Sequence, residues 1–297
     1  MSLYRFIDAQ KASYTTRFLC RVLDVPESSY FDWNATGRAR HAARDTDRSE
    51  RVGEIRAVFD ASDQTYGAPR VHRELHRRGV PMSRRHVAEL MAAHAIVGLS
   101  GREHSTITTR RDRLAAPFPD LVEQRFVAER PDQVWYGDIT YVWVDDRFWF
   151  LATVIDAATK EVVGWSFADH MRSELICDAL HRAVTRRGTI SDGLIFHSDR
   201  GTQYTSTEYG QVCANYKIRQ SMGRRGVCYD NAGAESFFAT LKRELVRRYS
   251  WPDAKTLRFH LYRWIETWYN RRRLHTSIGM RTPAKAYADY CQSVRAA

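Results

Sequence analysis

Three carboxylates, one inside a predicted strand, one at a strand end and one at the start of a predicted helix, could bind metal ions together. Asp138 lies inside the apolar stretch WYGDITYVWV, which has the alternating pattern of a strand, and an unpaired carboxylate is unfavourable there. Asp199 ends the short apolar run GLIFHSD, and Glu235 stands in the first turn of a predicted helix. The separation of Asp199 and Glu235 means little by itself, because the chain has 35 acidic residues. The setting of each acid therefore carries the inference.

Carboxylate oxygens are the ligands that Mg²⁺ prefers, and Mg²⁺ completes its shell with water and substrate phosphates. Two such ions, about 3.5–4 Å apart, activate the attacking oxygen and stabilise the leaving oxygen of a phosphodiester. The three acids, Asp138, Asp199 and Glu235, thus predict a site for two Mg²⁺ ions, with Mn²⁺ able to substitute. The competing interpretation makes them a bulge residue, a turn cap and a charge on a helix surface.

The elements predicted after residue 134 are in an order that can bring these acids together. Three strands, a helix, a strand, a helix, a strand and a helix are expected of a mixed α/β sheet of the RNase H-like type. Strand alternation places Asp138 on one face with Thr140 and Val142. The predicted strands cover 135–144, 147–159, 161–169, 193–199 and 219–223, and the predicted helices cover 173–188, 207–218, 232–249 and about 253–271.

Residues 66–98 predict two short helices joined by a tight turn. Pro69 suits the first turn of a helix, Gly79 ends that helix, and Ser83 is a good N-cap for the next one. This is helix-turn-helix geometry, which places a helix in the major groove of DNA. An ordinary helical hairpin with a charged face is the competing interpretation.

Cations gather on this helix pair. Arg84, Arg85 and His86 open the second helix, where positive charge is unfavourable against the helix dipole, and Arg70 lies on the first helix. A cost of this kind is easier to explain if DNA phosphates or base edges lie opposite. We therefore expect these four residues to contact DNA.

The rest of the amino-terminal part is less informative. Residues 1–33 have the spacing of short helices, residues 34–50 read as a linker or an exposed helix, and residues 100–133 read as a basic connector. We expect three parts: a helical region at 1–60, the helix-turn-helix with its connector at 61–115, and the catalytic core with its carboxy-terminal helices at 116–290.

The charge of the chain favours a polyanionic partner. The net charge is +11 and the pI is about 9.6, which suits double-stranded DNA. Residues 118–199 carry 8 Lys/Arg against 14 Asp/Glu, whereas residues 217–273 carry 14 against 5 and residues 38–111 carry 15 against 9. A basic body around an acidic middle suits phosphate binding combined with cation binding. A solvated basic surface without a partner is the alternative.

Other classes of protein are disfavoured by composition. With 43% hydrophobic residues the chain can form real cores, and no apolar run reaches the roughly 18 residues of a membrane span. The first residues lack the apolar stretch of a signal peptide, so we expect a cytoplasmic protein with no membrane partner. The five cysteines are scattered without a Cys-x-x-Cys pair, which disfavours a structural zinc site.

Several long motifs, in order along the chain, resemble one family. HSDRGTQYTS (197–206) and CYDNAGAESFFATLKREL (228–245) are similar to the second-frame, OrfB-type transposases of the IS-three insertion-sequence family, which share the retroviral integrase core. WYGDITYV (135–142), the helix-turn-helix region and WYNRRRLHTSIGMRTPAKAY (268–287) resemble further parts of the same proteins. The first 33 residues resemble their usual beginning, so the resemblance covers nearly the whole chain.

The resemblance implies a DDE-type transposase in which Asp138, Asp199 and Glu235 are the catalytic, metal-binding acids. It implies cleavage that frees a 3′-hydroxyl at the element's terminal repeats, and strand transfer by that hydroxyl into another phosphodiester. It also implies that Lys242 contacts DNA; seven positions after Glu235 is nearly two helical turns, which keeps both on one face. A homo-oligomer on DNA and an upstream-frame (OrfA) product, as fusion or partner, are further implications.

Five other residues are expected to contact DNA. Arg224, Arg225 and Asn231 lie in or beside the glycine-rich segment GRRGVCYDNAG, and Arg273 and His275 match the family's downstream basic motif. For the last two, packing among the final helices is the competing role.

Three positions near the acids depart from the family's usual pattern. Tyr136 and Gly137 precede the first acid where other small or branched residues are common, and Val227 replaces an acidic or polar residue. His197 is either a partner of Asp199 or a histidine at the end of a strand, and the sequence leaves both open.

Two other functions compete with transposition. The chain could be a catalytically inactive DNA-binding regulator derived from a transposase, against which the intact triad argues. It could instead be an RNase H-like nuclease for RNA hybrids, against which the helix-turn-helix region and the Lys242 spacing argue.

Overall fold

The computed structural model describes residues 3–99, 121, 128–188, 190, 192–223 and 232–296 of the chain. The chain divides into two units, Met1–Gly98 and Leu99–Ala297. Each unit has its own hydrophobic core.

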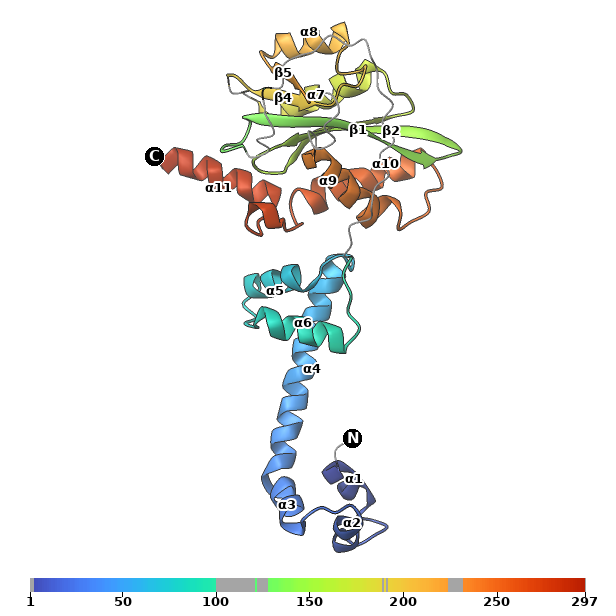
Figure 1. Ribbon diagram of the computed structural model, residues 1–297, viewed down its shortest axis with the longest axis vertical. Helices are drawn as coiled ribbons and strands as arrows, with labels where there is room; N and C mark the ends of the chain where they lie inside the picture. The colour runs from blue at the N-terminus through green and yellow to red at the C-terminus, as the bar shows by residue number, and fades with distance from the viewer. Residues whose placement is uncertain are drawn as a thin grey trace. The chain divides into compact units, whose positions relative to one another are not determined.

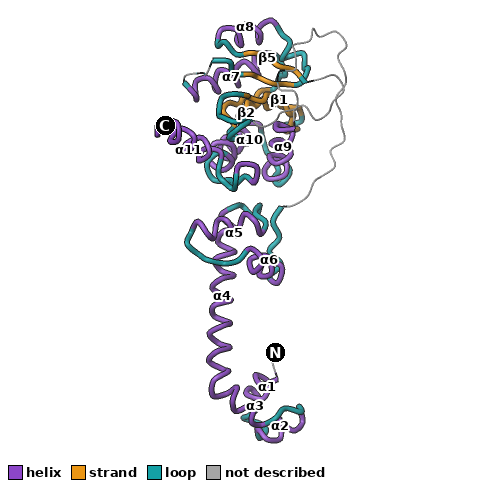
Figure 2. The backbone as a smooth tube through the Cα atoms, turned by 60° about the vertical axis from the view of Figure 1, so that its left-hand side comes forward, coloured by secondary structure: helices purple, strands orange, loops and turns teal. Residues whose placement is uncertain are grey.

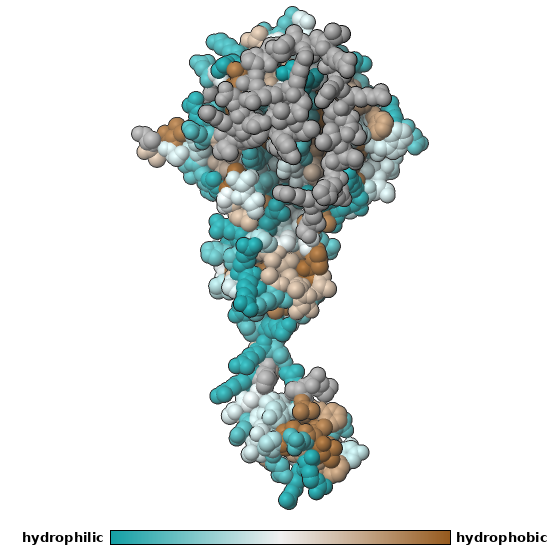
Figure 3. All heavy atoms as spheres, in the orientation of Figure 1, coloured by the Kyte–Doolittle hydropathy of each residue, from teal (hydrophilic) through white to brown (hydrophobic). Residues whose placement is uncertain are grey.

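The amino-terminal unit begins with three short helices, as the sequence predicted. They are α1 (Leu3–Gln10), α2 (Thr16–Val22) and α3 (Glu27–Asp32). A small core joins them, made of Ile7, Leu19, Cys20, Tyr30 and Trp33. Apolar side chains also gather on the surface of these helices, as Figure 3 shows; the exposed ones are Leu3, Phe6, Tyr14, Phe18, Val22 and Phe31.

The polar stretch that follows is an exposed helix, not a linker. A π-helical turn, Trp33–Gly37, leads into α4 (Arg38–Ala61), which is 24 residues long. Residues 38–50 carry no hydrophobic side chain larger than the methyl group of alanine, so no apolar stripe marks a helix there.

The helix pair predicted at 66–98 is confirmed. It consists of α5 (Ala68–Arg77) and α6 (Arg84–Ala93), which pack through buried Val71, Leu75, Val87, Leu90 and Met91. Gly79 follows α5 with φ at +77°, a conformation that favours glycine. The Ser83 hydroxyl accepts a hydrogen bond of 3.2 Å from the His86 amide and caps α6.

The second unit is built on one five-stranded sheet in the order β3-β2-β1-β4-β5. The strands are β1 (Val134–Val144), β2 (Arg147–Asp156), β3 (Val162–Ala168), β4 (Ile195–Ser198) and β5 (Arg219–Met222). The pairs β1–β2 and β2–β3 are antiparallel, whereas β1–β4 and β4–β5 are parallel. All five predicted strands are present, and this mixed order is that of the RNase H-like fold.

Helices cover both faces of the sheet (Figures 1 and 2). On one face, α7 (Ser173–Arg187) and α8 (Thr207–Asn215) enclose a core with Trp135 and Phe196. On the other face, α9 (Ala232–Leu241) and α10 (Ala254–Tyr262) pack on Tyr136, Val142 and Leu151. A last helix, α11 (Pro283–Ala296), was not predicted. Among the described residues, no helix is long and apolar enough to cross a membrane.

The two long helices predicted near the carboxy terminus each change their winding. After α9 comes a π-helical segment, Lys242–Val246, and after α10 comes another, Arg263–Tyr269. Because the first segment begins at Lys242, the residues between Glu235 and Leu241 keep α-helical spacing. Wider π turns are frequent at functional sites in helices.

Candidate active site

The pairing of β1 with β4 places two of the acids side by side. In this parallel pair Gly137 of β1 stands opposite Ser198 of β4, and Asp138 and Asp199 are the residues that follow them. Side chains at matched positions of neighbouring strands point to the same face of a sheet. The Asp138 carboxylate accepts a hydrogen bond of 2.8 Å from the Ile139 amide, and the Asp199 carboxylate accepts one of 3.1 Å from the Gly201 amide.

Helix α9 brings the third acid to the same face of the sheet. A side chain built at Gly233 would begin 3.2 Å from the ring of Tyr136, so the first turn of α9 lies against that ring. Tyr136 precedes Asp138 by two positions and therefore shares its face. Glu235 stands in this first turn, with its side chain exposed to solvent.

The charges in the site influence one another. Burial first, then the nearby Asp199 and Glu235, raise the pKa of Asp138, whereas the Ile139 amide and Lys242 lower it; together they bring it to about 8. Desolvation also raises the pKa of Asp199, although this residue keeps an exposed face, and that of Glu235. The two other acids thus lie within electrostatic range of Asp138, and a cation would relieve the repulsion.

The donor set suits Mg²⁺, since carboxylate oxygens are its preferred protein ligands. In the described part of the chain, however, no three histidine, cysteine or carboxylate side chains come together closely enough to hold a metal ion as they stand. Asp138, Asp199 and Glu235 lie on one face of the sheet, with Asp199 and Glu235 within electrostatic range of Asp138.

The departure from the family pattern at Gly137 has a steric cause. A Cβ atom at this position would lie 2.3 Å from the Phe196 ring and 3.2 Å from the Tyr204 ring. Only glycine lets the aromatic ring of β4 approach β1 so closely next to Asp138.

We expect the Gly137→Ala substitution to destabilise the core unit by about 1–3 kcal/mol, because the well-packed Phe196 ring must move. Gly210→Ala on α8 is the matched control, since its Cβ would make only an ordinary contact of 3.6 Å with Gln220. Thermal unfolding of both variants checks the prediction. Equal melting temperatures for the two would show that the ring tolerates the methyl group.

Lys242 lies between the acids and the tip of the β1–β2 hairpin. Its ammonium nitrogen is 5.2 Å from the centroid of the Tyr141 ring. Burial and the nearby Arg247 lower the pKa of Lys242, whereas Asp138 raises it. The predicted proximity of Lys242 to the acids therefore has support from the charges, and its side chain is half-buried.

Two predicted DNA contacts lie inside the protein, which favours the competing role in packing. Arg273 is buried and forms a forked ion pair with buried Glu244, with Nη2 at 2.7 Å from Oε1. His275 is also buried, with its ring edge-on to Tyr269 at 4.7 Å between centroids. Side chains placed in this way hold the last helices together and present little surface to a phosphate.

The predicted cations of the amino-terminal unit have surface positions. Arg84 and Arg85 are exposed on α6, and Arg85 also pairs with Glu89 at 2.8 Å. Arg70 lies over the ring of Tyr66 at 5.7 Å, and His86 is half-buried. The remaining predicted contacts, Arg224, Arg225 and Asn231, lie outside the described residues.

Two neighbours of the acids become clear only in the structure. Tyr204 is buried, and burial, Asp138 and Asp199 in that order raise the pKa of its hydroxyl, which places it beside both acids. Its place in the HSDRGTQYTS motif was the available signal. His197 is buried on β4, and its Nδ1 lies 2.9 Å from the hydroxyl of Ser221 on β5, so this histidine links two strands.

Comparisons with known proteins agree with this architecture. Residues 128–228 and 216–283 each match a family model described as an integrase core domain, and residues 46–104 match one described as an HTH-like domain. The chain is 36% identical over 280 residues to the transposase InsF for insertion sequence IS3A of Escherichia coli (strain K12), covering 94% of this chain and 96% of that protein. It is 33% identical over 293 residues to the transposase for insertion sequence element IS629 of Shigella sonnei, covering 97% and 96%.

The solved structures to which the chain is similar include retroviral integrases. One is the intasome of simian T-cell lymphotropic virus in complex with PP2A regulatory subunit B56 gamma, with a TM-score of 0.46 and 16% identity over 73% of this chain and 70% of that one. Another is the catalytic core domain of HTLV-2 integrase in complex with magnesium, with a TM-score of 0.42 and 18% identity over 53% and 97%.

Proposed function

The chain belongs to the IS3 family of insertion-sequence transposases, with an integrase core domain and an HTH-like domain, and we propose that it cleaves and joins DNA at the terminal repeats of its element. The proposed reaction is DDE-type: water attacks a phosphodiester at the element end and frees a 3′-hydroxyl, and that hydroxyl then attacks another phosphodiester and displaces its 3′-oxygen. The observation that carries the proposal is the register that sets Asp138 beside Asp199, on the face that α9 covers with its first turn.

We assign Asp138, Asp199 and Glu235 as the catalytic acids and as the ligands of two divalent cations, Mg²⁺ or Mn²⁺. When bound, such ions supply Lewis-acid stabilisation of the attacking and leaving oxygens. The protein's part is to place three carboxylates on one face and to keep Asp138 in a partly desolvated position. Asp138 would hold a cation in its ionised form, since a carboxylate ligand must be deprotonated. The positive charge of the cations would offset the mutual repulsion of the three carboxylates.

We assign Lys242 to a phosphate of the bound strand. Its ammonium group lies within electrostatic range of Asp138, so it can hold a phosphate next to the cleaved bond. A lysine serves as a point charge for phosphate in many such sites.

Replacing Lys242 by alanine is expected to weaken DNA binding and to reduce the slope of log affinity against log salt by about 0.9, the value for one lost phosphate contact. Lys285→Ala is the matched control, because Lys285 is an exposed cation on α11 that pairs with Asp289 at 2.9 Å. Fluorescence anisotropy over a salt series measures both slopes. An unchanged slope for Lys242→Ala would remove this residue from the DNA interface.

The remaining assignments concern partners. Double-stranded DNA is the proposed substrate, with terminal repeats bound by α5 and α6 through Arg70, Arg84, Arg85 and His86. We also propose a homo-oligomer on DNA, the upstream-frame (OrfA) product as fusion or partner, and a cytoplasmic location. The proposed functional parts are 1–60, 61–115 and 116–290.

The experiment that tests the function compares substrates. Purified protein is given Mg²⁺ with a terminal-repeat duplex, an unrelated duplex and an RNA–DNA hybrid of the same sequence. Nicking of the terminal-repeat duplex at the element end is expected, with little cleavage of the others. Preferred cleavage of the hybrid would favour a nuclease, and binding without any nicking would favour an inactive regulator.

A further inference from the structure

The tip of the β1–β2 hairpin carries three large aromatic side chains that the fold leaves in solvent. Tyr141 is 52% exposed, Trp143 is 59% exposed and Phe148 is 48% exposed. The register pairs Trp143 with Phe148, and the Phe148 ring lies edge-on to Trp143 at 4.8 Å and to Tyr141 at 5.3 Å. The three rings, here called the aromatic hairpin surface, thus form one continuous surface patch. Contiguous exposed apolar surface of this kind usually marks a binding site.

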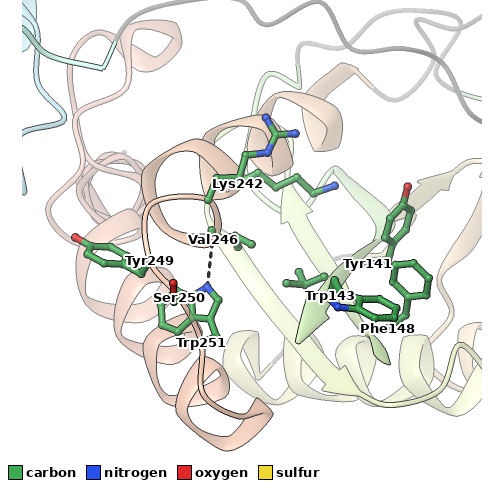
Figure 4. Close-up of a pocket in the computed structure, with 10 residues that line it drawn as sticks. Tyr141, Trp143, Phe148, Lys242, Val246, Tyr249, Ser250 and Trp251 are labelled. Carbon is green, nitrogen blue, oxygen red and sulfur yellow. Dashed lines mark hydrogen bonds between the residues drawn. The ribbon is translucent and has the colours of Figure 1, made fainter. Parts of the chain in front are cut away.

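A second wall faces this surface and makes it concave. The chain that continues from α9 supplies Lys242, Val246, Tyr249 and Trp251, and Figure 4 shows them across from the aromatic hairpin surface. The two walls line a pocket of about 460 Å³, here called the hairpin pocket. Its volume lies within the roughly 300–1,000 Å³ of sites for small ligands.

The wall opposite the rings is partly fixed by its own contacts. The indole nitrogen of Trp251 donates a hydrogen bond of 3.0 Å to the Val246 carbonyl, and its ring lies edge-on to Tyr249 at 5.9 Å. These contacts hold the Trp251 side chain in place on this wall of the hairpin pocket.

The charges of the hairpin pocket favour an anionic ligand. Two of the residues that line the pocket are cations, Lys242 and Arg247, and no lining residue is acidic. Asp145 and Asp146, at the turn of the hairpin, are not among the lining residues. Aromatic faces beside cations are the combination with which proteins bind unpaired nucleotides: the rings stack on bases and the cations hold phosphates.

The position of the hairpin pocket links it to the acids. Val142, which lines the hairpin pocket, follows Asp138 by four positions on the same face of β1, which is about 13 Å along a strand. That distance spans roughly four nucleotides stacked as in DNA. Lys242 connects the two places, because its ammonium group lies over Tyr141 and its charge acts on Asp138.

We propose that the hairpin pocket binds an unpaired nucleotide of the DNA strand held at the acids, with its base stacked on the aromatic hairpin surface. The proposal rests on the proposed function and deepens it. The site would select DNA that is frayed, flapped or single-stranded beside the cleaved phosphate. A fully paired end would have to open to fill it, and opening costs unstacking energy that base–aromatic stacking offsets.

The test measures binding alone, in EDTA, so that it does not depend on metal or cleavage. A short fluorescent oligothymidylate and a hairpin duplex are titrated with the full chain and with its variants. Trp143→Ala is expected to weaken oligothymidylate binding about tenfold, as loss of one stacked base does, with a much smaller effect on the duplex. Trp143→Phe should retain most of the affinity, because a phenyl ring still stacks.

Two further variants make the result specific. Tyr262→Ala removes an aromatic side chain of similar exposure, 55%, that does not line the hairpin pocket, and its affinity should equal that of the wild type. Phe148→Ala tests the same surface from β2, should Trp143→Ala fail to fold. The proposed function is tested separately: it would fail if the wild type did not nick the terminal-repeat duplex in Mg²⁺, even where oligothymidylate binding in EDTA depended on Trp143.

Two results would overturn the proposal. In the first, Trp143→Ala and Phe148→Ala both bind oligothymidylate as tightly as the wild type does; a changed oligomeric state in sedimentation would then show that a second copy of the chain covers the surface. In the second, both variants bind the duplex and the single strand more weakly by the same factor, which would indicate a general DNA contact.

Discussion

Strand transfer by the Glu235→Gln variant is expected to fall by a factor on the order of 10³ or more, with terminal-repeat binding nearly unchanged. Glutamine keeps the size of the side chain but removes the charge that holds a cation, and such cations contribute several kcal/mol of transition-state stabilisation. Because Glu235 is exposed at the start of α9, the fold should not suffer. Gel assays of joined products, beside a binding titration on the same preparation, measure both quantities.

The matched control is Glu174→Gln. Glu174 is also an exposed glutamate in the first helical turn, on α7, where it pairs with Arg172 at 3.1 Å. We expect full strand transfer from this variant. Full activity of Glu235→Gln, or an equal loss in both variants, would remove Glu235 from the catalytic group.

The second large effect combines a loss of activity with a gain of stability. We expect Asp138→Asn to abolish cleavage and yet to stabilise the metal-free protein at pH 8. The pKa of Asp138 is raised in the folded chain to about 8, far above its value of 3.8 in an unfolded chain. The folded state therefore holds its proton more tightly, so this group's stabilising contribution is complete below about pH 4 and is lost as the pH rises to about 8.

Asparagine resembles the protonated acid and has no such dependence on pH. At pH 8 the gain is expected to be on the order of a few kcal/mol, reduced because Asp138 keeps a partly exposed face. Melting temperatures in EDTA at several pH values measure it, and Asp178→Asn, at an exposed position on α7, is the control. Added Mg²⁺ should stabilise the wild type and leave Asp138→Asn unaffected. Curves of melting temperature against pH that run parallel for wild type and variant would show that folding does not destabilise the ionised Asp138 carboxylate.

The fold could be predicted because its elements have strong local patterns. The apolar β-rich runs from Val134 onward and the helix signals at Ser83 and Gly79 identify their elements without knowledge of long-range contacts. The register of β1 and β4 could not be predicted in this way. It depends on how the Phe196 ring fits above Gly137, a contact between residues far apart in the chain.

The predicted site shows the same division. The settings of the three acids in strand, strand end and helix made them candidates, and the resemblance to OrfB-type transposases then assigned them. Arg273 was assigned to DNA because it matches the family's downstream basic motif, and its buried partner Glu244 lies 29 positions away. A partner at that distance has no local signature, so burial of this charge was visible only in the structure.

The aromatic hairpin surface was hidden for a similar reason. In the sequence, Tyr141, Trp143 and Phe148 read as ordinary strand residues with high β propensity. Whether such rings are buried depends on which helix covers that end of the sheet. The structure leaves them exposed, opposite the chain that carries Lys242.

The central claim is that Asp138, Asp199 and Glu235 close around two cations. A crystal structure of the chain with terminal-repeat DNA and Mn²⁺, with anomalous scattering recorded for manganese, tests it most directly. We predict two manganese peaks, about 3.5–4 Å apart, between these three carboxylates. Manganese bound elsewhere, or carboxylates that stay apart with no metal between them, would contradict the account.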